Sequence, residues 1–296
     1  MWPLPLPNLT ARETYQRCVP GIRPPLGQRL AGLEEEVVDA SARFETAANA
    51  AALHTLDQSS FRPTSPDLAA ALPRVYTDRM AKVGRPGRMI YDKLKMAAVV
   101  CPLCGHREVT TLDHHLPKSS FPLLSVTPSN LIPCCSDCNR VKQSTVPELV
   151  EEQTLHPYFD YVDDEQWLAA EVLQGEPAAL RFFVSPPQDW PDTLRARVIH
   201  HFETLDLADL YGAQGATELA GNAYVLQRFF DAGGAEAVRD YLQLKAESWS
   251  RRWRNHWKGA AYAALAASDW FCTAGCAISE SHGCTIAVPP STPHRI

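Results

Sequence analysis

Two cysteine pairs with the same internal spacing limit what the middle of this chain can fold into. The first pair is Cys101 and Cys104, and the second is Cys135 and Cys138. Four thiolates on two such turns can close a tetrahedral zinc site, which holds a small fold together without a large hydrophobic core. We therefore predict a structural Zn²⁺ here, the alternative being four free buried cysteines. Cys134 also has an acceptable ligand spacing from Cys138, but Cys135 repeats the spacing of the first pair and is preferred.

The segment between the two pairs contains residues suited to a second, harder metal. Residues 105–134 make a gap of 30 residues, whereas zinc ribbons usually have about 15–20. The gap holds Asp113 and His114, and Asn139 follows the last cysteine directly. Carboxylate and amide oxygens suit Mg²⁺ or Mn²⁺, and adjacent strand residues point to opposite faces, so a ligand and a base can flank one phosphate. These residues predict a hydrolytic metal site beside the zinc.

Hydrophobic periodicity predicts a mainly α-helical chain with a small α+β insert. We predict helices over 29–56, 88–99 and 235–271, with a glycine break at 233–234, and a short helix from 136. Residues 107–116 have a strand pattern, whereas four prolines in 117–133 predict an ordered loop without a regular element. The six prolines of residues 1–27 predict an extended arm.

Composition excludes some classes of protein. The chain has 296 residues, 45% hydrophobic and 21% charged, and a net charge of −6, which is typical of a soluble globular protein without a general basic surface. Neither a membrane span nor a secretory signal is recognisable. The chain has nine cysteines, and four of them are spaced for a metal. An odd number with this spacing does not suit a framework of disulfides, so we expect the reducing environment of the cytoplasm.

Three short motifs together resemble the HNH endonucleases with a structural zinc. They are Leu-Asp-His-His-Leu-Pro-Lys at 112–118, Asn-Leu-Ile-Pro at 130–133, and Cys-Ser-Asp-Cys-Asn-Arg-Val-Lys at 135–142. The resemblance covers about 101–142 and implies a central ββα-metal module between helical regions. It makes His114 the general base, Asp113 and Asn139 the ligands of a catalytic Mg²⁺ or Mn²⁺, and Asn130 the residue that orients the histidine ring through a hydrogen bond. If the strand register differs, His115 takes the role of the base.

The resemblance also implies an activity. It predicts hydrolysis of phosphodiester bonds in DNA, leaving 5′-phosphate and 3′-hydroxyl ends, with activity falling below about pH 6 as the imidazole gains a proton. RNA as the substrate is an alternative, as is a non-catalytic zinc-stabilised module that binds nucleic acid or protein. By analogy with other HNH proteins, we expect a role in bacterial anti-phage defence beside an ATPase or another regulatory partner. Homo-oligomers are compatible with this picture, and no membrane is involved.

The resemblance divides the chain into four segments. Residues 1–87 form the proline-rich arm and a helical region, 88–147 the nuclease module, 148–271 a C-terminal helical region, and 272–296 an irregular tail. Residues 74–95 hold seven basic and two acidic residues, so they can contact phosphates or form a solvated helix face. We predict five nucleic-acid contacts: Lys118, Arg140, Lys142, Arg85 and Arg88.

Overall fold

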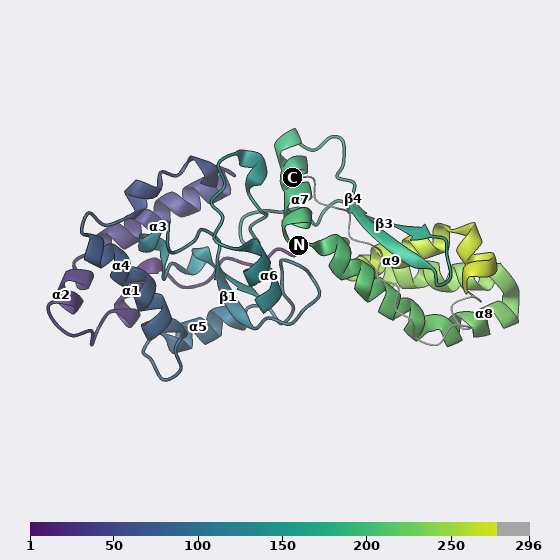
Figure 1. Ribbon diagram of the computed structural model, residues 1–296, viewed down its shortest axis with the longest axis horizontal. Helices are drawn as coiled ribbons and strands as arrows, with labels where there is room; N and C mark the ends of the chain where they lie inside the picture. Colours follow the sequence, from purple (N-terminus) through teal and green to yellow (C-terminus); the bar gives the residue numbers. More distant parts are fainter. Residues whose placement is uncertain (277–296) are drawn as a thin grey trace. The chain divides into compact units, whose positions relative to one another are not determined.

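A computed structural model describes residues 1–276 of the chain and divides it into two compact units, Met1–Val162 and Asp163–Ile296 (Figure 1). The described chain is mostly helical, and it contains two antiparallel sheets of two strands each. A mainly α protein with a small β insert is therefore confirmed at this level. The second sheet was not expected. None of the helices in residues 1–276 is long and apolar enough to cross a membrane.

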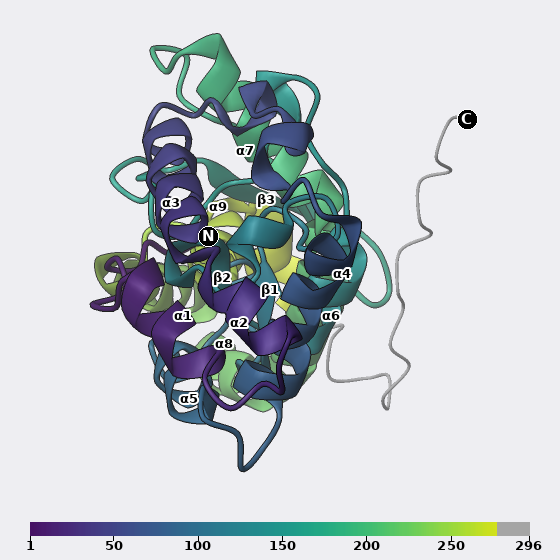
Figure 2. The ribbon, with the colours of Figure 1, turned by 90° about the vertical axis from the view of Figure 1, so that its left-hand side faces the viewer.

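Six α-helices build the first unit, together with a π-helical turn at Val75–Ala81 (Figure 2). They are α1 (Ala11–Cys18), α2 (Leu26–Ala31), α3 (Glu34–Asn49), α4 (Pro66–Arg74), α5 (Arg88–Lys95) and α6 (Ser136–Lys142). One hydrophobic core joins the first five helices to the central segment. Its buried residues run from Ala11 to Leu131. Burial of this apolar surface is the main force that holds the unit together.

Helix α3 shows why the predicted helix over 29–56 is wrong at both ends. Its buried face is spaced by three and four residues, through Val37, Ala40, Phe44 and Ala48, as the periodicity predicted. However, the chain turns at residues 32–33, because three consecutive glutamates favour a new helix N-terminus at Glu34. The predicted helix over 88–99 is also shorter, since α5 ends at Lys95.

The proline-rich arm is extended only over its first part, because α1 begins at Ala11. Thr10 and Glu13 form a capping box: the Thr10 hydroxyl accepts from the Glu13 amide at 3.1 Å, and the Glu13 carboxylate accepts from the Thr10 amide at 2.8 Å. Ahead of this helix, the Trp2 amide donates to the Pro102 carbonyl at 2.9 Å. The arm therefore lies against the turn that carries the first cysteine pair.

A small hairpin and the helix that follows it carry the candidate site. Strands β1 (Thr111–His114) and β2 (Leu131–Cys134) are antiparallel, with Asp113 opposite Ile132, and α6 begins at Ser136. The prediction that 117–133 lacks a regular element is wrong at its end, where β2 includes Pro133. A two-stranded sheet consists of edge strands, and an edge strand tolerates the missing N–H of a proline.

The second unit packs a β-hairpin against long helices. Strands β3 (Leu168–Leu173) and β4 (Ala179–Val184) contact α8 (Leu207–Arg252) and α9 (Trp257–Ala267), and α7 (Asp192–Thr204) precedes α8. As predicted, α8 is interrupted at Gly233 and Gly234.

The predicted helix over 235–271 ends early, at Arg252. Two side chains stabilise the interruption that follows: Asn255 accepts from the Trp167 amide at 2.8 Å, and His256 caps α9 by accepting from Lys258 at 3.0 Å. The start of the predicted irregular tail is a π-helical turn at Phe271–Gly275. Residues 277–296 lie outside the described part.

Candidate metal centre and active site

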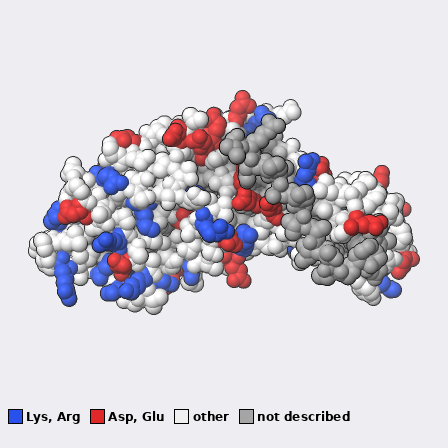
Figure 3. Space-filling view, viewed as in Figure 1, with Lys and Arg blue, Asp and Glu red and all other residues white. Residues whose placement is uncertain are grey.

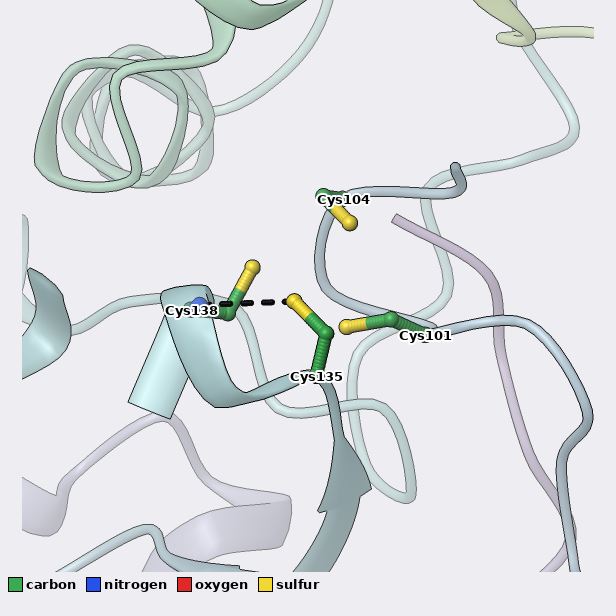
Figure 4. A group of neighbouring side chains, drawn as sticks. All are labelled: Cys101, Cys104, Cys135 and Cys138. Atoms are coloured by element: carbon green, nitrogen blue, oxygen red, sulfur yellow. Dashed lines mark hydrogen bonds between the residues drawn. The ribbon is translucent and has the colours of Figure 1, made fainter. Parts of the chain in front are cut away.

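The four predicted zinc ligands come together in a buried cluster (Figure 4). Cys101 and Cys104 lie on the turn before β1, Cys135 is the N-cap of α6, and Cys138 is in its first turn. All four sulfurs lie within 4.8 Å of one another. A zinc tetrahedron with bonds of about 2.3 Å needs sulfurs about 3.8 Å apart, so a small inward movement closes the site. The cluster can therefore hold a structural metal such as zinc.

Hydrogen bonds among the four thiols raise the pKa of Cys101 and Cys138 and lower that of the other two. The thiols of Cys101, Cys104 and Cys138 hold the pKa of Cys135 well below its ordinary value, and the Cys138 amide donates to the Cys135 sulfur at 3.4 Å. A hydrogen bond from Cys101 lowers the pKa of Cys104 to about 7. Negative charge on these two sulfurs is thus stabilised at neutral pH.

Cys134 is not part of this cluster. It is the last residue of β2 and is buried, and burial raises the pKa of its thiol. Cys135, and not Cys134, belongs to the cluster that could hold a metal, as the spacing predicted.

Asp113 is buried in β1 and forms an ion pair across to α6. The ammonium of Lys142 lies 3.0 Å from its Oδ2 atom, and the two side chains are 7% and 6% exposed, Lys142 first. Burial raises the pKa of Asp113, while the charge of Lys142 opposes that rise. The charged end of Lys142 is inside the protein in this structure, so its exposure gives no support to the predicted contact with nucleic acid, which stays a prediction.

His114 is held by contacts that the sequence did not reveal. Its Nε2 atom lies 2.9 Å from the carbonyl oxygen of Ser125, and the ring of Tyr76 packs edge-on with centroids 4.4 Å apart. Because a carbonyl only accepts, Nε2 carries the hydrogen and the lone pair of the neutral ring is on Nδ1. Burial lowers the pKa of His114 to about 3. No sequence pattern identified Tyr76 or Ser125, since both lie far from His114 along the chain.

Asn130 differs from its expected role. Its Oδ1 accepts from the Leu116 amide at 2.8 Å, and its Nδ2 donates to the carbonyls of Leu116 at 3.0 Å and Leu124 at 3.5 Å. These bonds use both amide hydrogens, so none is directed at the ring of His114. Asn130 instead braces the loop between β1 and β2, which carries the carbonyl that holds His114.

Asn139 and Asp113 are suitable magnesium donors on adjoining elements. Asn139 is partly buried in α6, three residues before Lys142 and so on the same helical face. Carboxylate and amide oxygens fit Mg²⁺, which keeps several waters and needs few protein ligands. Apart from the four cysteines, residues 1–276 contain no group of three or more His, Cys, Asp or Glu side chains that could hold a metal. The oxygens of Asp113 and Asn139 are of the kind that Mg²⁺ prefers, while the carboxylate of Asp113 is paired with Lys142 in this structure.

His115 lies in a different environment from His114. Its ring packs against that of His156, with centroids 4.2 Å apart, and both residues are buried. His156 also packs against Phe159 at 4.7 Å. This aromatic packing around residues 156–160 supports the end of β1.

The remaining predicted nucleic-acid contacts differ in exposure. The Arg140 side chain is 77% exposed, and Arg85 is also exposed. Arg88 pairs with Asp92 at 2.8 Å and supports its own helix. Lys118 is partly buried, with its ammonium 4.9 Å from the centre of the Tyr76 ring. Arg85, Arg140 and Lys118 therefore remain able to reach a ligand.

Comparison with known proteins gives a relative but no function. No family model and no solved structure matches the chain. The chain is similar to protein Ea31 of Escherichia phage lambda, with 29% identity over 215 residues, which covers 68% of this chain and 73% of that protein. The name of that relative states no activity.

Proposed function

We propose that this protein is a metal-dependent HNH-type endonuclease that hydrolyses phosphodiester bonds in DNA. One observation carries the proposal: the cysteine cluster joins the start of α6 to the turn before β1. Strand β1 carries Asp113 and His114, and α6 carries Asn139. An acid and an amide on adjoining elements, with a neutral imidazole on the opposite face of the strand, are the groups that metal-assisted hydrolysis of a phosphodiester requires.

The residues would divide the reaction as follows. The Nδ1 atom of His114 takes a proton from the attacking water, while the Ser125 carbonyl holds the ring through Nε2. Asp113 and Asn139 would hold the Mg²⁺ or Mn²⁺, which supplies charge stabilisation at the phosphate and the leaving 3′-oxygen. Lys118, which lies over Tyr76 and lowers the pKa of His114 by its charge, can contact the phosphate.

A basic surface on α5 supports a nucleic-acid substrate. Figure 3 shows Lys and Arg side chains gathered along the lower edge of the first unit, where Figure 1 shows α5. Lys93 on α5 is exposed, as are Lys82 and Arg85 in the segment just before it; Met89 of the helix and Met96 at its end are 70% and 78% exposed. The same helix contacts both β1 and β2. A phosphate backbone bound on this surface would therefore lie next to the hairpin that carries His114.

A role in conflict between phages and bacteria is part of the proposal. Its support is the analogy with HNH defence proteins, and the relative named above is encoded by a phage. Co-purification from the native host tests for an ATPase partner. If no ATPase co-purifies, the expected partner is contradicted and the proposed nuclease activity is not.

The nuclease itself is tested with supercoiled plasmid. We expect nicking or linearisation with Mg²⁺ or Mn²⁺, loss of cleavage with EDTA, and a reduction of about a hundredfold or more in His114→Ala, because proton transfer contributes about 10²–10⁴ in rate. His200→Ala, at a half-buried histidine of the second unit, is the matched control.

Three outcomes separate the candidate functions. Cleavage by His114→Ala at the wild-type rate would contradict the assignment of the base. Cleavage of RNA but not plasmid would change the substrate. Binding without cleavage of either nucleic acid would favour the non-catalytic zinc module.

A further inference from the structure

We propose that Lys142 sets the divalent-metal affinity of Asp113 by competing for the same carboxylate. This inference rests on the proposed function, since it concerns the metal ligand of that site. Lys142 would then be a positioning residue, because it acts through Asp113 and the end of β1.

The contacts of Lys142 use the full donor capacity of its ammonium group. It pairs with Oδ2 of Asp113 at 3.0 Å and donates to the main-chain carbonyls of His114 at 3.2 Å and His115 at 2.9 Å. Three donors thus meet three acceptors, all of them at the end of β1. One side chain from the last turn of α6 neutralises the acid and fixes the backbone of the neighbouring histidines.

A divalent ion at Asp113 would meet this positive charge in a poorly solvated place. Both side chains are buried, so water screens their charges weakly and the repulsion between an ammonium and a metal ion at short distance is large. The ammonium and the ion therefore cannot both contact the carboxylate without a large cost. Metal binding requires Lys142 to withdraw from Asp113, and its withdrawal also releases the two carbonyls.

Lys118 provides a matched comparison. Its charge lowers the pKa of Asp113 as that of Lys142 does, but Lys142 acts more strongly and also through a hydrogen bond. The ammonium of Lys118 lies instead over the ring of Tyr76, at 4.9 Å from its centre. Replacing either lysine by methionine removes one positive charge near Asp113. Only Lys142→Met also removes a direct contact with the carboxylate that the metal would bind.

The test is a titration of the full, zinc-loaded chain with Mn²⁺. Electron paramagnetic resonance measures the concentration of unbound Mn²⁺ at each step. We expect Lys142→Met to bind Mn²⁺ about tenfold more tightly than the wild type. Lys118→Met should give a clearly smaller gain, and Asp113→Asn should lose the site. If Lys142 had only a structural role, Lys142→Met would bind Mn²⁺ more weakly than the wild type, because disorder at β1 weakens metal binding.

A second measurement covers the case in which Lys142→Met fails to fold. In the wild type, the side-chain ¹⁵N resonance of Lys142 should report a buried, hydrogen-bonded ammonium that loses this protection as Mg²⁺ is added. Two results would overturn the inference but not the proposed metal centre. One is an unchanged or weaker Mn²⁺ affinity in folded Lys142→Met, and the other is a Lys142 resonance that saturating Mg²⁺ does not change. If no variant and no wild-type protein binds Mn²⁺, the inference and the proposed metal centre both fail.

Discussion

His114 illustrates how one buried residue can differ from its ordinary solution behaviour. An unperturbed imidazole has a pKa of about 6.5, and on that basis the sequence predicted a loss of activity below about pH 6. Burial lowers the pKa of His114 to about 3 in the folded protein, so the ring remains neutral well below pH 6. With this pKa, protonation of His114 in the folded protein predicts a loss of activity near pH 3 rather than below pH 6; the rate of plasmid cleavage as a function of pH separates the two predictions.

The burial of His114 predicts a pH-dependent stability. Below pH 6.5 the unfolded chain binds a proton at this residue that the folded chain does not. The free energy of unfolding therefore falls as the pH falls from about 6.5 toward 3, by about 1.4 kcal/mol per pH unit, and this stability is fully present above that range. In His114→Gln this contribution is absent, so the stability advantage of the wild type should shrink by about 2 kcal/mol between pH 7 and pH 5.

Chemical denaturation of the two zinc-loaded proteins at both pH values measures this change. Other titrating groups are common to the two proteins and cancel in the difference. An equal difference at pH 7 and pH 5 would show that His114 is solvated in the folded state.

At the scale of elements, α6 depends on the cluster at its start. It has only seven residues, too few to be stable as an isolated helix. Cys135 and Cys138 anchor its N-terminus, and Lys142 anchors its last turn to β1. Zinc should therefore be needed to position Asn139 and Lys142.

Two adjacent cysteines give a direct test of this dependence. Cys135→Ser removes a ligand and should reduce bound zinc from about one ion per chain to a small fraction of that, with a lower unfolding temperature. Cys134→Ser changes the neighbouring thiol, which is buried outside the cluster, and should retain zinc. Zinc content by mass spectrometry separates the two, and the reverse result would identify Cys134 as the ligand.

Elements with a local signal were predictable, and those decided by distant contacts were not. The cysteine spacing, the start of α6 and the break at Gly233–Gly234 could be derived from neighbouring residues. The capping box at Thr10 and Glu13 was a readable signal for α1 that the prolines obscured. The alternation of Leu180, Arg181 and Phe182 was a readable signal for the second hairpin, in which Leu180 and Phe182 are buried and Arg181 is exposed. No local pattern, by contrast, indicated that Asn255 would end α8 by binding the start of β3.

The candidate site was predictable in its composition but not in its contacts. The resemblance of the three motifs made Asp113, His114 and Asn139 the candidate residues. It could not indicate that Lys142 is buried, because lysines usually lie at the surface. It also could not identify Tyr76, which approaches His114 only after the first unit has packed.

For the whole molecule, net charge conceals an uneven distribution. Residues 1–162 hold 17 basic and 17 acidic residues, so the formal charge of −6 comes entirely from residues 163–296. Within the neutral first unit, the stretch 74–95 carries a clear basic excess. An acidic protein can therefore still bind a polyanion through one local surface.

The salt dependence of DNA binding tests this distribution. Neutralising Lys82, Arg85 and Lys93 to glutamine should reduce the slope of log affinity against log salt by about 2 to 3, since each phosphate contact contributes about 0.9. Neutralising three exposed arginines of the second unit, Arg251, Arg252 and Arg254, is the charge-matched control and should leave the slope unchanged. Binding is measured in a His114→Ala background to prevent cleavage. Equal slopes in the two triple variants would exclude α5 as the contact surface.

The order of the zinc ligands along the chain has a consequence during synthesis. Cys101 and Cys104 leave the ribosome long before Cys135 and Cys138, with 30 residues between the pairs. A nascent chain thus carries Asp113 and His114 into the cell before the helix that completes the site exists. Under the proposed function, the metal site is therefore complete only after Asn139 and the second cysteine pair have been made.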